Sequence, residues 1–164
     1  MKKLGILFIV ILLLCGCKKG DYEVRQAPCG TEAETPTTGV ISICATDELS
    51  APVMSTQEGD RLYIGDDYEV SLQTLAGGDI NETLKNCTGF DRSNLTVIET
   101  QKDGMKRYDC AWSATGVGTQ YVARTTVLDD GNFHYVLTVT GCDGEHVAEA
   151  WQQLADSFTV SIAQ

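Results

Sequence analysis

The chain has 164 residues, 43% of them hydrophobic, and its 12 basic and 23 acidic side chains give a formal net charge of −11 at pH 7. A chain of this length and hydrophobic content is long enough for one domain with a sizeable core. Its negative surface repels nucleic acid and anionic lipid headgroups, which argues against a nucleic-acid-binding function.

The first 16 residues have the layout of a secretory signal. Lys2 and Lys3 form a short basic start, and the apolar run 4–14 is too short to cross a hydrocarbon core of about 30 Å as a helix. A small residue, Gly16, then precedes Cys17. The pattern predicts a cleaved signal peptide rather than a membrane span.

The stretch Leu14-Cys15-Gly16-Cys17 resembles the lipobox of bacterial lipoproteins, in which leucine lies three residues before the modified cysteine and a small residue lies immediately before it. Cys15 does not fit, because Leu14 would then stand in the small-residue position. The resemblance implies lipidation of the Cys17 sulfur, signal cleavage between Gly16 and Cys17, and attachment to the membrane through acyl chains such as palmitate. The alternative is an ordinary secreted protein with cysteines near its cleavage site.

The lipidated end would place the protein on the extracytoplasmic face of a membrane. Lys18 follows Cys17 and is not the aspartate that favours retention at the inner membrane in lipoproteins of bacteria with two membranes. We therefore expect the outer membrane if the host has two membranes, and the outer face of the cell membrane if it has one. The acyl chains on Cys17 would make the membrane contact.

The sequence predicts three parts. Residues 1–16 are the signal peptide, residues 17–39 a lipidated, flexible tether, and residues 40–164 a globular domain. The tether is rich in Gly, Pro, Thr and Glu and holds few apolar side chains. It therefore cannot bury enough surface to offset the entropy of an ordered chain.

The globular part begins with β-rich segments. Residues 40–46 alternate well enough for a strand, and residues 49–59 predict a loop around Pro52. The runs 61–65 and 68–75 predict a hairpin whose second strand alternates apolar and polar side chains. One face of this hairpin is expected in the core and the other in water.

A short helix is expected after a Gly-Gly break. Asp79 is a good N-cap, Gly89 can close the C-terminal end, and Ile80, Leu84 and Cys87 form an apolar stripe at helical spacing. The stripe predicts a helix packed on the sheet rather than a site.

A meander of four β-rich runs follows, with tight turns that imply antiparallel neighbours: residues 95–100, 105–114, 120–128 and 133–141. The second run has one face with two aromatic side chains, made of Tyr108, Cys110, Trp112 and Ala114. A second helix, starting at Asp143 or Gly144, is predicted by an apolar stripe of Val147, Ala150, Trp151, Leu154 and Phe158. Residues 159–162 would add a last short strand or trail along the domain.

These elements predict an α+β fold: a single antiparallel sheet of about five to seven strands, with a four-strand meander in its C-terminal half, covered by two helices. The element order and the ending Trp151 … Asp156-Ser157-Phe158 resemble the PsbP-like class of small α/β domains over about residues 60 to 160. That resemblance implies a binding or assembly role, and no functional residue of the class can be matched here.

Five cysteines remain beyond the signal and Cys17, an odd number that leaves at least one unpaired within the chain: Cys29, Cys44, Cys87, Cys110 and Cys142. An oxidising compartment permits up to two bridges. Cys87 and Cys110 are candidates if the first helix packs on the aromatic face of the second run; two buried free thiols are the alternative. Cys44 and Cys142 are candidates if the first strand runs beside the last strand of the meander. Cys29 would be left over.

The search for catalytic and metal-binding motifs gives mostly absences. The sequence has no Gly-x-Ser-x-Gly, no His-Glu-x-x-His, no phosphate-binding glycine loop, no EF-hand spacing and no Cys-x-x-Cys, so we expect neither a metal nor a cofactor. Asp129, Asp130 and His134 lie close together around one hairpin. They would suffice for a weak cation site, although a solvated turn already explains Asp130-Gly131.

The predicted function is therefore a membrane-anchored lipoprotein with a non-enzymatic acidic domain that binds a protein, a peptide or an envelope component. The alternative is an envelope hydrolase or metal-dependent enzyme whose site combines distant residues such as His134, His146 and several carboxylates. A concave pocket in which histidines or carboxylates converge would favour the enzyme, and a shallow surface without them would favour the binding module.

Overall fold

The computed structural model describes residues 36–45, residue 49 and residues 51–162. The predicted signal peptide, the lipobox-like stretch with Gly16 and Cys17, and Cys29 lie outside the described residues. Among the helices that are described, none has the length and apolar character needed to cross a membrane.

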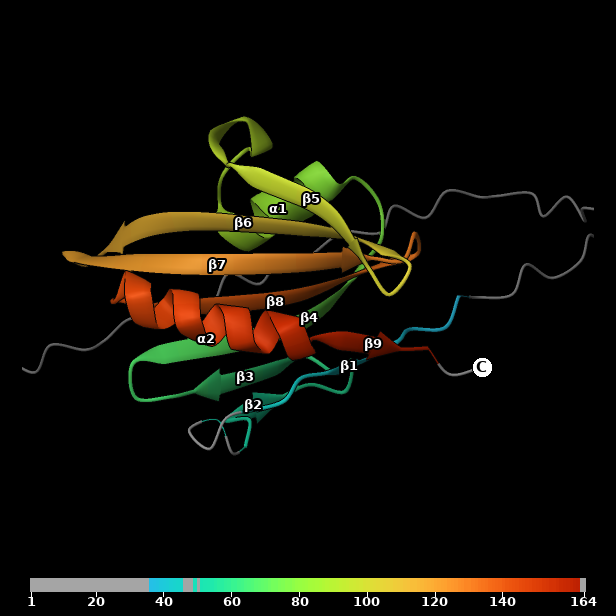
Figure 1. Cartoon of the computed structure of the whole chain (residues 1–164), viewed down its shortest axis with the longest axis horizontal. Helices are drawn as coiled ribbons and strands as arrows, with labels where there is room; N and C mark the ends of the chain where they lie inside the picture. Colours follow the sequence, from blue (N-terminus) through green and yellow to red (C-terminus); the bar gives the residue numbers. More distant parts are fainter. Residues whose placement is uncertain (1–35, 46–48, 50, 163–164) are drawn as a thin grey trace, which may run out of the picture. The chain divides into compact units, whose positions relative to one another are not determined.

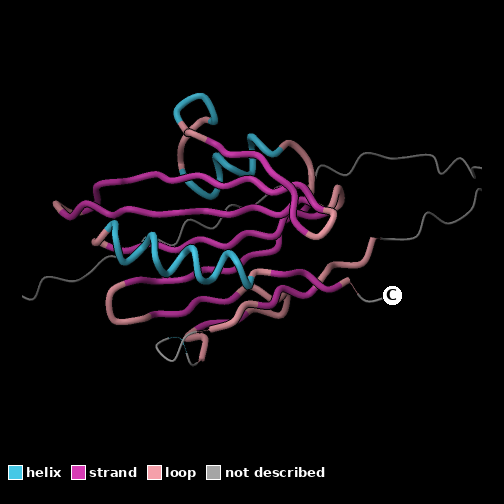
Figure 2. Tube along the Cα trace, viewed as in Figure 1, coloured by secondary structure: helices cyan, strands magenta, loops and turns pink. Residues whose placement is uncertain are grey.

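The fold is built on a seven-stranded sheet in the order β2-β3-β4-β8-β7-β6-β5, in which every neighbouring pair is antiparallel (Figures 1 and 2). The strands are β2 (Met54–Ser55), β3 (Arg61–Ile64), β4 (Tyr68–Ala76), β5 (Val97–Lys102), β6 (Met105–Gly116), β7 (Thr119–Asp129) and β8 (Phe133–Gly141). The predicted hairpin is β3–β4, and the predicted meander is β5–β8. The predicted α+β class and antiparallel sheet are confirmed.

Two α-helices cover opposite faces of this sheet. Figure 1 shows α2 (Gly144–Ser157) in front of the sheet and α1 (Ile80–Thr88) behind it. A short 3-10 helix, η2 (Arg92–Asn94), connects α1 to β5. Both predicted helices are confirmed. Asp79 is the expected N-cap of α1 and accepts a hydrogen bond from Asn81 N (2.9 Å), and α2 begins at Gly144 with Asp143 as its N-cap, which accepts from Glu145 N (2.8 Å).

The core has two parts because the central strands are buried on both faces. On the α2 side the buried residues include Val70, Leu72, Leu137, Val139, Leu154 and Phe158. On the α1 side they are Leu84, Tyr108, Cys110, Val127 and Val136. The expectation that one face of the β3–β4 hairpin lies in water is correct only in part. Ser71 and Gln73, on that face of β4, are half-buried.

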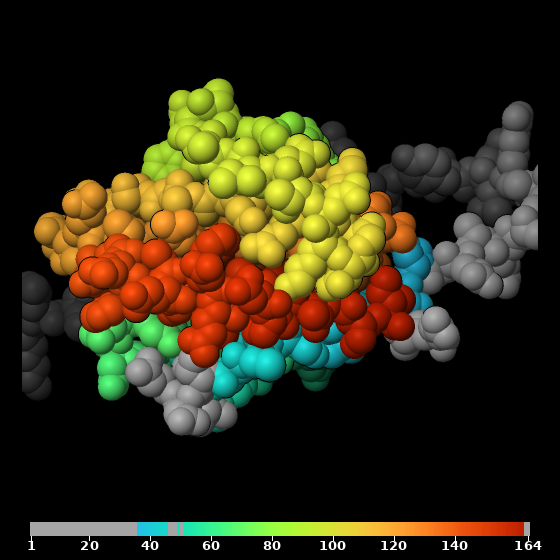
Figure 3. Space-filling model, in the orientation of Figure 1, coloured from blue at the N-terminus to red at the C-terminus, as the bar shows by residue number. Residues whose placement is uncertain are grey.

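The prediction of a single sheet needs correction. β1 (Val40–Ser42) does not join the main sheet but pairs antiparallel with β9 (Thr159–Ser161). Ile41 of β1 and Phe158 share the α2-side core, and Figure 3 shows the β1 segment in blue beside the C-terminal end of α2 in red. The loop expected over residues 49–59 also contains the short strand β2, which extends the sheet by pairing with β3.

The chain that enters β1 is held tightly against β8. Gly39 N donates a hydrogen bond to Tyr135 Oη (2.9 Å), and Tyr135 Oη donates in turn to Asp130 Oδ2 (2.9 Å). A Cβ atom on Gly39 would collide with the Val160 side chain and would lie 2.9 Å from Tyr135 Oη. Glycine is therefore required here by the close approach of the backbone to the ring.

Candidate binding pocket

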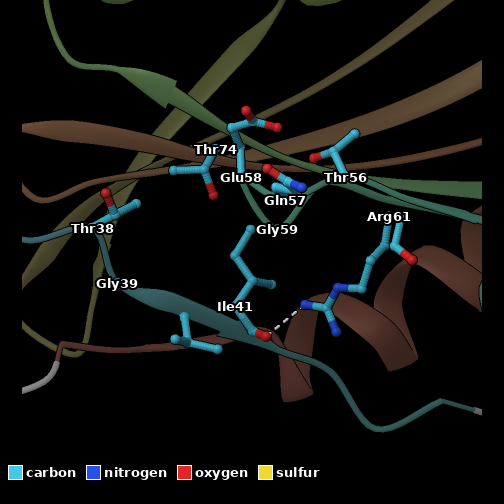
Figure 4. Close-up of a pocket in the computed structure, with 11 residues that line it drawn as sticks. Thr38, Gly39, Ile41, Thr56, Gln57, Glu58, Gly59, Arg61 and Thr74 are labelled. Carbon is cyan, nitrogen blue, oxygen red and sulfur yellow. Dashed lines mark hydrogen bonds between the residues drawn. The ribbon is translucent and has the colours of Figure 1, made fainter.

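A hollow of about 410 Å³ lies where β1 faces β3, β4 and the turn between β2 and β3. Figure 4 shows its lining, in which β1 forms one wall and the β2–β3 turn lies opposite. Its polar lining includes Thr38, Ser55, Thr56, Gln57, Arg61 and Thr74, and its apolar side is made by Val40 and Ile41. The hollow is larger than two others on the molecule, which have volumes of about 280 and 290 Å³.

The guanidinium of Arg61 is the charged group that faces β1 across this hollow. Its Nη2 donates to the carbonyl oxygen of Ile41 at 2.6 Å, which ties β3 to β1. Its Nε is buried and has no hydrogen-bond partner in the described part of the chain. A buried donor without a partner costs about 1–3 kcal/mol, and more when the group is charged. The Nε–H group of Arg61 therefore lacks a hydrogen-bond acceptor among the described residues.

No nearby carboxylate of the described residues forms an ion pair with Arg61. Arg61 takes part in none of the ion pairs among them. Asp60, the preceding residue, accepts a hydrogen bond from Thr74 N through Oδ1 (2.9 Å). Glu58 is exposed in the β2–β3 turn, and in Figure 4 its carboxylate points away from the Arg61 guanidinium. Among the described residues, no carboxylate is therefore paired with the Arg61 guanidinium.

A second hollow, of about 280 Å³, lies beside α2 over β5 and β6 and is lined in part by Ile98, Arg124 and Trp151. Two of its polar side chains, Asp109 and Trp151, already have hydrogen-bond partners, and Arg124 lies over the Trp151 ring. Arg107 Nε and Asp109 Oδ2 form an ion pair at 2.8 Å, and Thr126 Oγ1 donates to Asp109 Oδ1 at 2.7 Å. Trp151 Nε1 donates to Thr126 Oγ1 at 3.0 Å. This network stabilises α2 on the sheet.

The third hollow, of about 290 Å³, lies at the edge of the fold near the β3–β4 turn. Asp66, Asp67 and Glu69 line it together with Cys142, so its charge is strongly negative. The described residues that line it include no lysine or arginine to pair with an anionic ligand.

The histidines of the alternative enzymatic hypothesis do not come together. His134 is buried on the α1 side, where its Nδ1 lies 2.7 Å from Thr83 Oγ1 and its Nε2 lies 3.7 Å from Asp129 Oδ1. His146 is exposed, with Nδ1 3.9 Å from Asp67 Oδ2. His134 is near the start of β8, whereas Asp67 precedes Tyr68, which pairs with the last residue of β8. The two rings therefore occupy opposite ends of that strand.

Asp129 and Asp130, which were considered for a weak cation site, accept hydrogen bonds from backbone N–H groups. Asp129 Oδ1 accepts from Gly131 N (2.7 Å), and Asp130 Oδ1 accepts from Asn132 N (2.8 Å) and Phe133 N (2.7 Å). Among the described residues, no group of three or more histidine, cysteine, aspartate or glutamate side chains is arranged to hold a metal ion. These hydrogen bonds shape the β7–β8 turn.

The four described cysteines are free, with Cys44 and Cys142 exposed, Cys87 half-buried and Cys110 buried. The expected packing of α1 is confirmed, since Cys87 and Cys110 lie in the same α1-side cluster. The arrangement that favoured a bridge between Cys44 and Cys142 is not found. β1 pairs with β9 instead of running beside β8.

We predict that Cys110 reacts with iodoacetamide at pH 8 at least tenfold more slowly than Cys44 and Cys142. Burial is the main cause that raises the pKa of the Cys110 thiol to about 11, and the thiolate is the reactive form. Burial also raises the pKa of Cys87, which should react at an intermediate rate. Peptide mapping after timed labelling measures each site separately.

Equal labelling rates at Cys110 and Cys44 would contradict this prediction. The prediction would also be contradicted if Cys87 and Cys110 were labelled only after the protein had been reduced. That result would show that the two thiols form the bridge considered from the sequence.

The described fold has solved structural relatives, whereas no protein-family model and no curated protein sequence matches the chain. One relative is LpqN, described as involved in cell envelope biogenesis of Mycobacterium tuberculosis. It has a TM-score of 0.52 and 14% identity, and the match covers 79% of this chain and 87% of that one. Another is a protein of Bacteroides thetaiotaomicron, with a TM-score of 0.51 and 10% identity, over 79% of this chain and 50% of that one. At these identities the likeness shows a shared fold.

Sequence reasoning did not single out Arg61. In the segment Arg61-Leu62-Tyr63-Ile64, the hydrophobic pattern favours the Leu62 and Ile64 face as the inner one, yet Tyr63 is 6% exposed and Ile64 is 53% exposed. Arg61 shares the face of Tyr63 because side chains alternate along a strand. The sequence pattern therefore places Arg61 on the expected outer face, and its inward orientation is known only from the structure.

Proposed function

We propose that the protein is a lipid-anchored lipoprotein of the bacterial cell envelope, whose globular part binds an envelope component in the Arg61 pocket without catalysing a reaction. Three observations support this proposal. The lipobox ends at Cys17. The fold resembles LpqN, a protein described as involved in cell envelope biogenesis. An antiparallel sheet with helices packed on it is also what the PsbP-like resemblance implies, and we include that class in the proposal.

The observation that carries the binding role is a hollow of about 410 Å³ lined by Arg61, whose guanidinium is in no ion pair among the described residues. The lining of the hollow contains hydroxyl, amide and guanidinium groups. Such groups recognise ligands by hydrogen bonding. His134 and His146 do not line this hollow. We therefore favour recognition over acid–base chemistry at this site.

The anchor is tested with a Cys17→Ala variant of the full chain. The unmodified protein from membranes should show an intact mass that lacks residues 1–16 and carries acyl chains, because lipidation at Cys17 precedes cleavage after Gly16. The variant should lack the acyl chains, which would contribute about 0.8 kcal/mol of membrane binding per CH₂, and should keep residues 1–16 because cleavage follows lipidation.

A Cys15→Ala variant is the matched control and should keep both the acyl mass and the membrane fraction. An unacylated Cys17 in the unmodified protein, or a Cys17→Ala variant that is acylated as before, would overturn the lipoprotein proposal.

A further inference from the structure

We propose that the Arg61 pocket binds a sugar that carries one anionic group, either a carboxylate or a phosphate. This inference rests on the proposed function, because it names the chemical class of the envelope component. It is argued from the guanidinium, from the hydroxyl groups of the lining and from the charge of the whole chain.

An oxyanion is the ligand group that best matches the Arg61 guanidinium. Arginine has five N–H donors, and the hydrogen bond from Nη2 to Ile41 O uses one of them. Nε is buried and has no partner among the described residues, so it can donate to an anion in the hollow only after a small shift of the Arg61 side chain. Carboxylate and phosphate oxygens accept two N–H bonds from arginine side by side, and such charge-assisted bonds are about twice as strong as neutral ones. A neutral acceptor would leave the charge uncompensated.

The other polar residues of the lining can form hydrogen bonds with the hydroxyl groups of a sugar. Thr38, Thr56 and Thr74 line the hollow together with Gln57. Each hydroxyl and amide both donates and accepts, which matches sugar hydroxyls. Thr56 Oγ1 already accepts from Asp60 N at 3.1 Å, so its own O–H is left to donate.

The apolar side chains on the β1 wall complete the match. Val40 and Ile41 line the hollow, and Figure 4 shows Ile41 opposite the polar turn. The C–H groups on the flat face of a sugar ring can pack against the Ile41 side chain. A volume of about 410 Å³ lies within the usual range for small-molecule sites.

The charge of the chain limits the ligand to one anionic group. After removal of the signal, ten basic and 23 acidic side chains remain. The field of such a surface repels polyanions. Arg61 is the one arginine or lysine in the lining of this hollow, and Glu58 opposes it with a negative charge. One guanidinium therefore compensates one anionic group.

The experiment is isothermal titration calorimetry with the full chain extracted from membranes in detergent. The probes are D-glucuronate, D-glucose 6-phosphate, D-glucose, acetate and inorganic phosphate. We expect one of the two charged sugars to bind at least tenfold more tightly than glucose and than the free anion of the same type. The charged sugar that binds more tightly identifies the anionic group as carboxylate or phosphate.

Arg61→Gln should weaken binding of the charged sugar at least tenfold, and Arg92→Gln, which removes the same charge outside the pocket, should leave it unchanged. Thr74→Val is a second pocket variant that keeps the Arg61 bond to Ile41. It should weaken binding severalfold even if Arg61→Gln proves too unstable to measure. Circular dichroism checks that each variant is folded.

Three results would overturn the inference: glucose that binds as tightly as the charged sugars, full affinity in both pocket variants, or no binding of any probe at millimolar concentration. These results are independent of the anchor. An acylated Cys17 with no sugar binding would reject the ligand class alone, whereas an unacylated Cys17 would reject the lipoprotein proposal whatever the titrations give.

Discussion

Replacing Phe158 with alanine is expected to lower the free energy of unfolding by about 3–5 kcal/mol. Phe158 follows the last turn of α2 and is fully buried in the α2-side core, where Ile41 of β1 also lies. The substitution removes a large buried ring and leaves a cavity that rigid neighbours on α2 and the sheet can fill only in part. Urea unfolding followed by circular dichroism measures the loss.

Tyr121→Ala is a suitable control because it truncates another aromatic side chain that is 39% exposed. We expect its effect to be well below that of Phe158→Ala. Equal effects of the two substitutions would mean that β1 and α2 do not depend on a packed Phe158 side chain.

Asp109→Ala is expected to lower the free energy of unfolding by about 3 kcal/mol, at the lower end of the range for breaking a buried pair. Asp109 accepts from Arg107 Nε through both carboxylate oxygens (3.0 and 2.8 Å), and these two side chains are only 13% and 16% exposed. The substitution would leave the Arg107 charge without its partner. It would also remove the acceptor of Thr126, which holds Trp151 of α2.

The matched control is Asp91→Ala, which breaks an ion pair of the same length, Lys85 Nζ to Asp91 Oδ1 at 2.8 Å, between side chains that are 58% and 63% exposed. Exposed pairs contribute little because water and salt screen them. The midpoint of urea unfolding should therefore stay nearly unchanged in Asp91→Ala and fall clearly in Asp109→Ala. Similar midpoints in the two variants would show that burial does not increase the contribution of the Arg107–Asp109 ion pair to stability.

Local signals in the sequence were sufficient to predict most of the elements. The N-caps Asp79 and Asp143, the apolar stripes of both helices and the turn at Asp103-Gly104 are short-range features, and each corresponds to an element boundary. Asp103 and Gly104 both have positive φ angles, of 53° and 81°, as a two-residue hairpin turn of type I′ requires.

Non-local pairing could not be predicted in the same way. The sequence of β8 is apolar almost throughout, which agrees with burial on both faces but does not identify β4 and β7 as its neighbours. The strand over residues 40–42 shows nothing that selects β9 over β8. The pairing considered for Cys44 and Cys142 depended on β1 running beside β8, and that arrangement is not found.

The binding pocket depends on the same non-local contacts. Thr38 and Arg61 belong to segments that come together only when β1 has paired with β9, since Ile41 O is the acceptor of Arg61 Nη2. No motif connects these residues, because their spacing in the sequence has no relation to their distance in space. The hydrophobic pattern of β3 did not help, because it favours Leu62 and Ile64 rather than Arg61 and Tyr63 as the inward residues.

The pairing of Val40 with Ser161 also sets an order of assembly. Synthesis proceeds from the N-terminus, so β1 exists long before its partner, and the two residues are separated by 121 positions. Closing so large a loop carries an entropy cost and slows folding. The wall of the pocket formed by β1 is therefore completed last, after β9 has been made. A chain that ends before residue 159 would retain the strands of the seven-stranded sheet but would present Arg61 without its partner on β1.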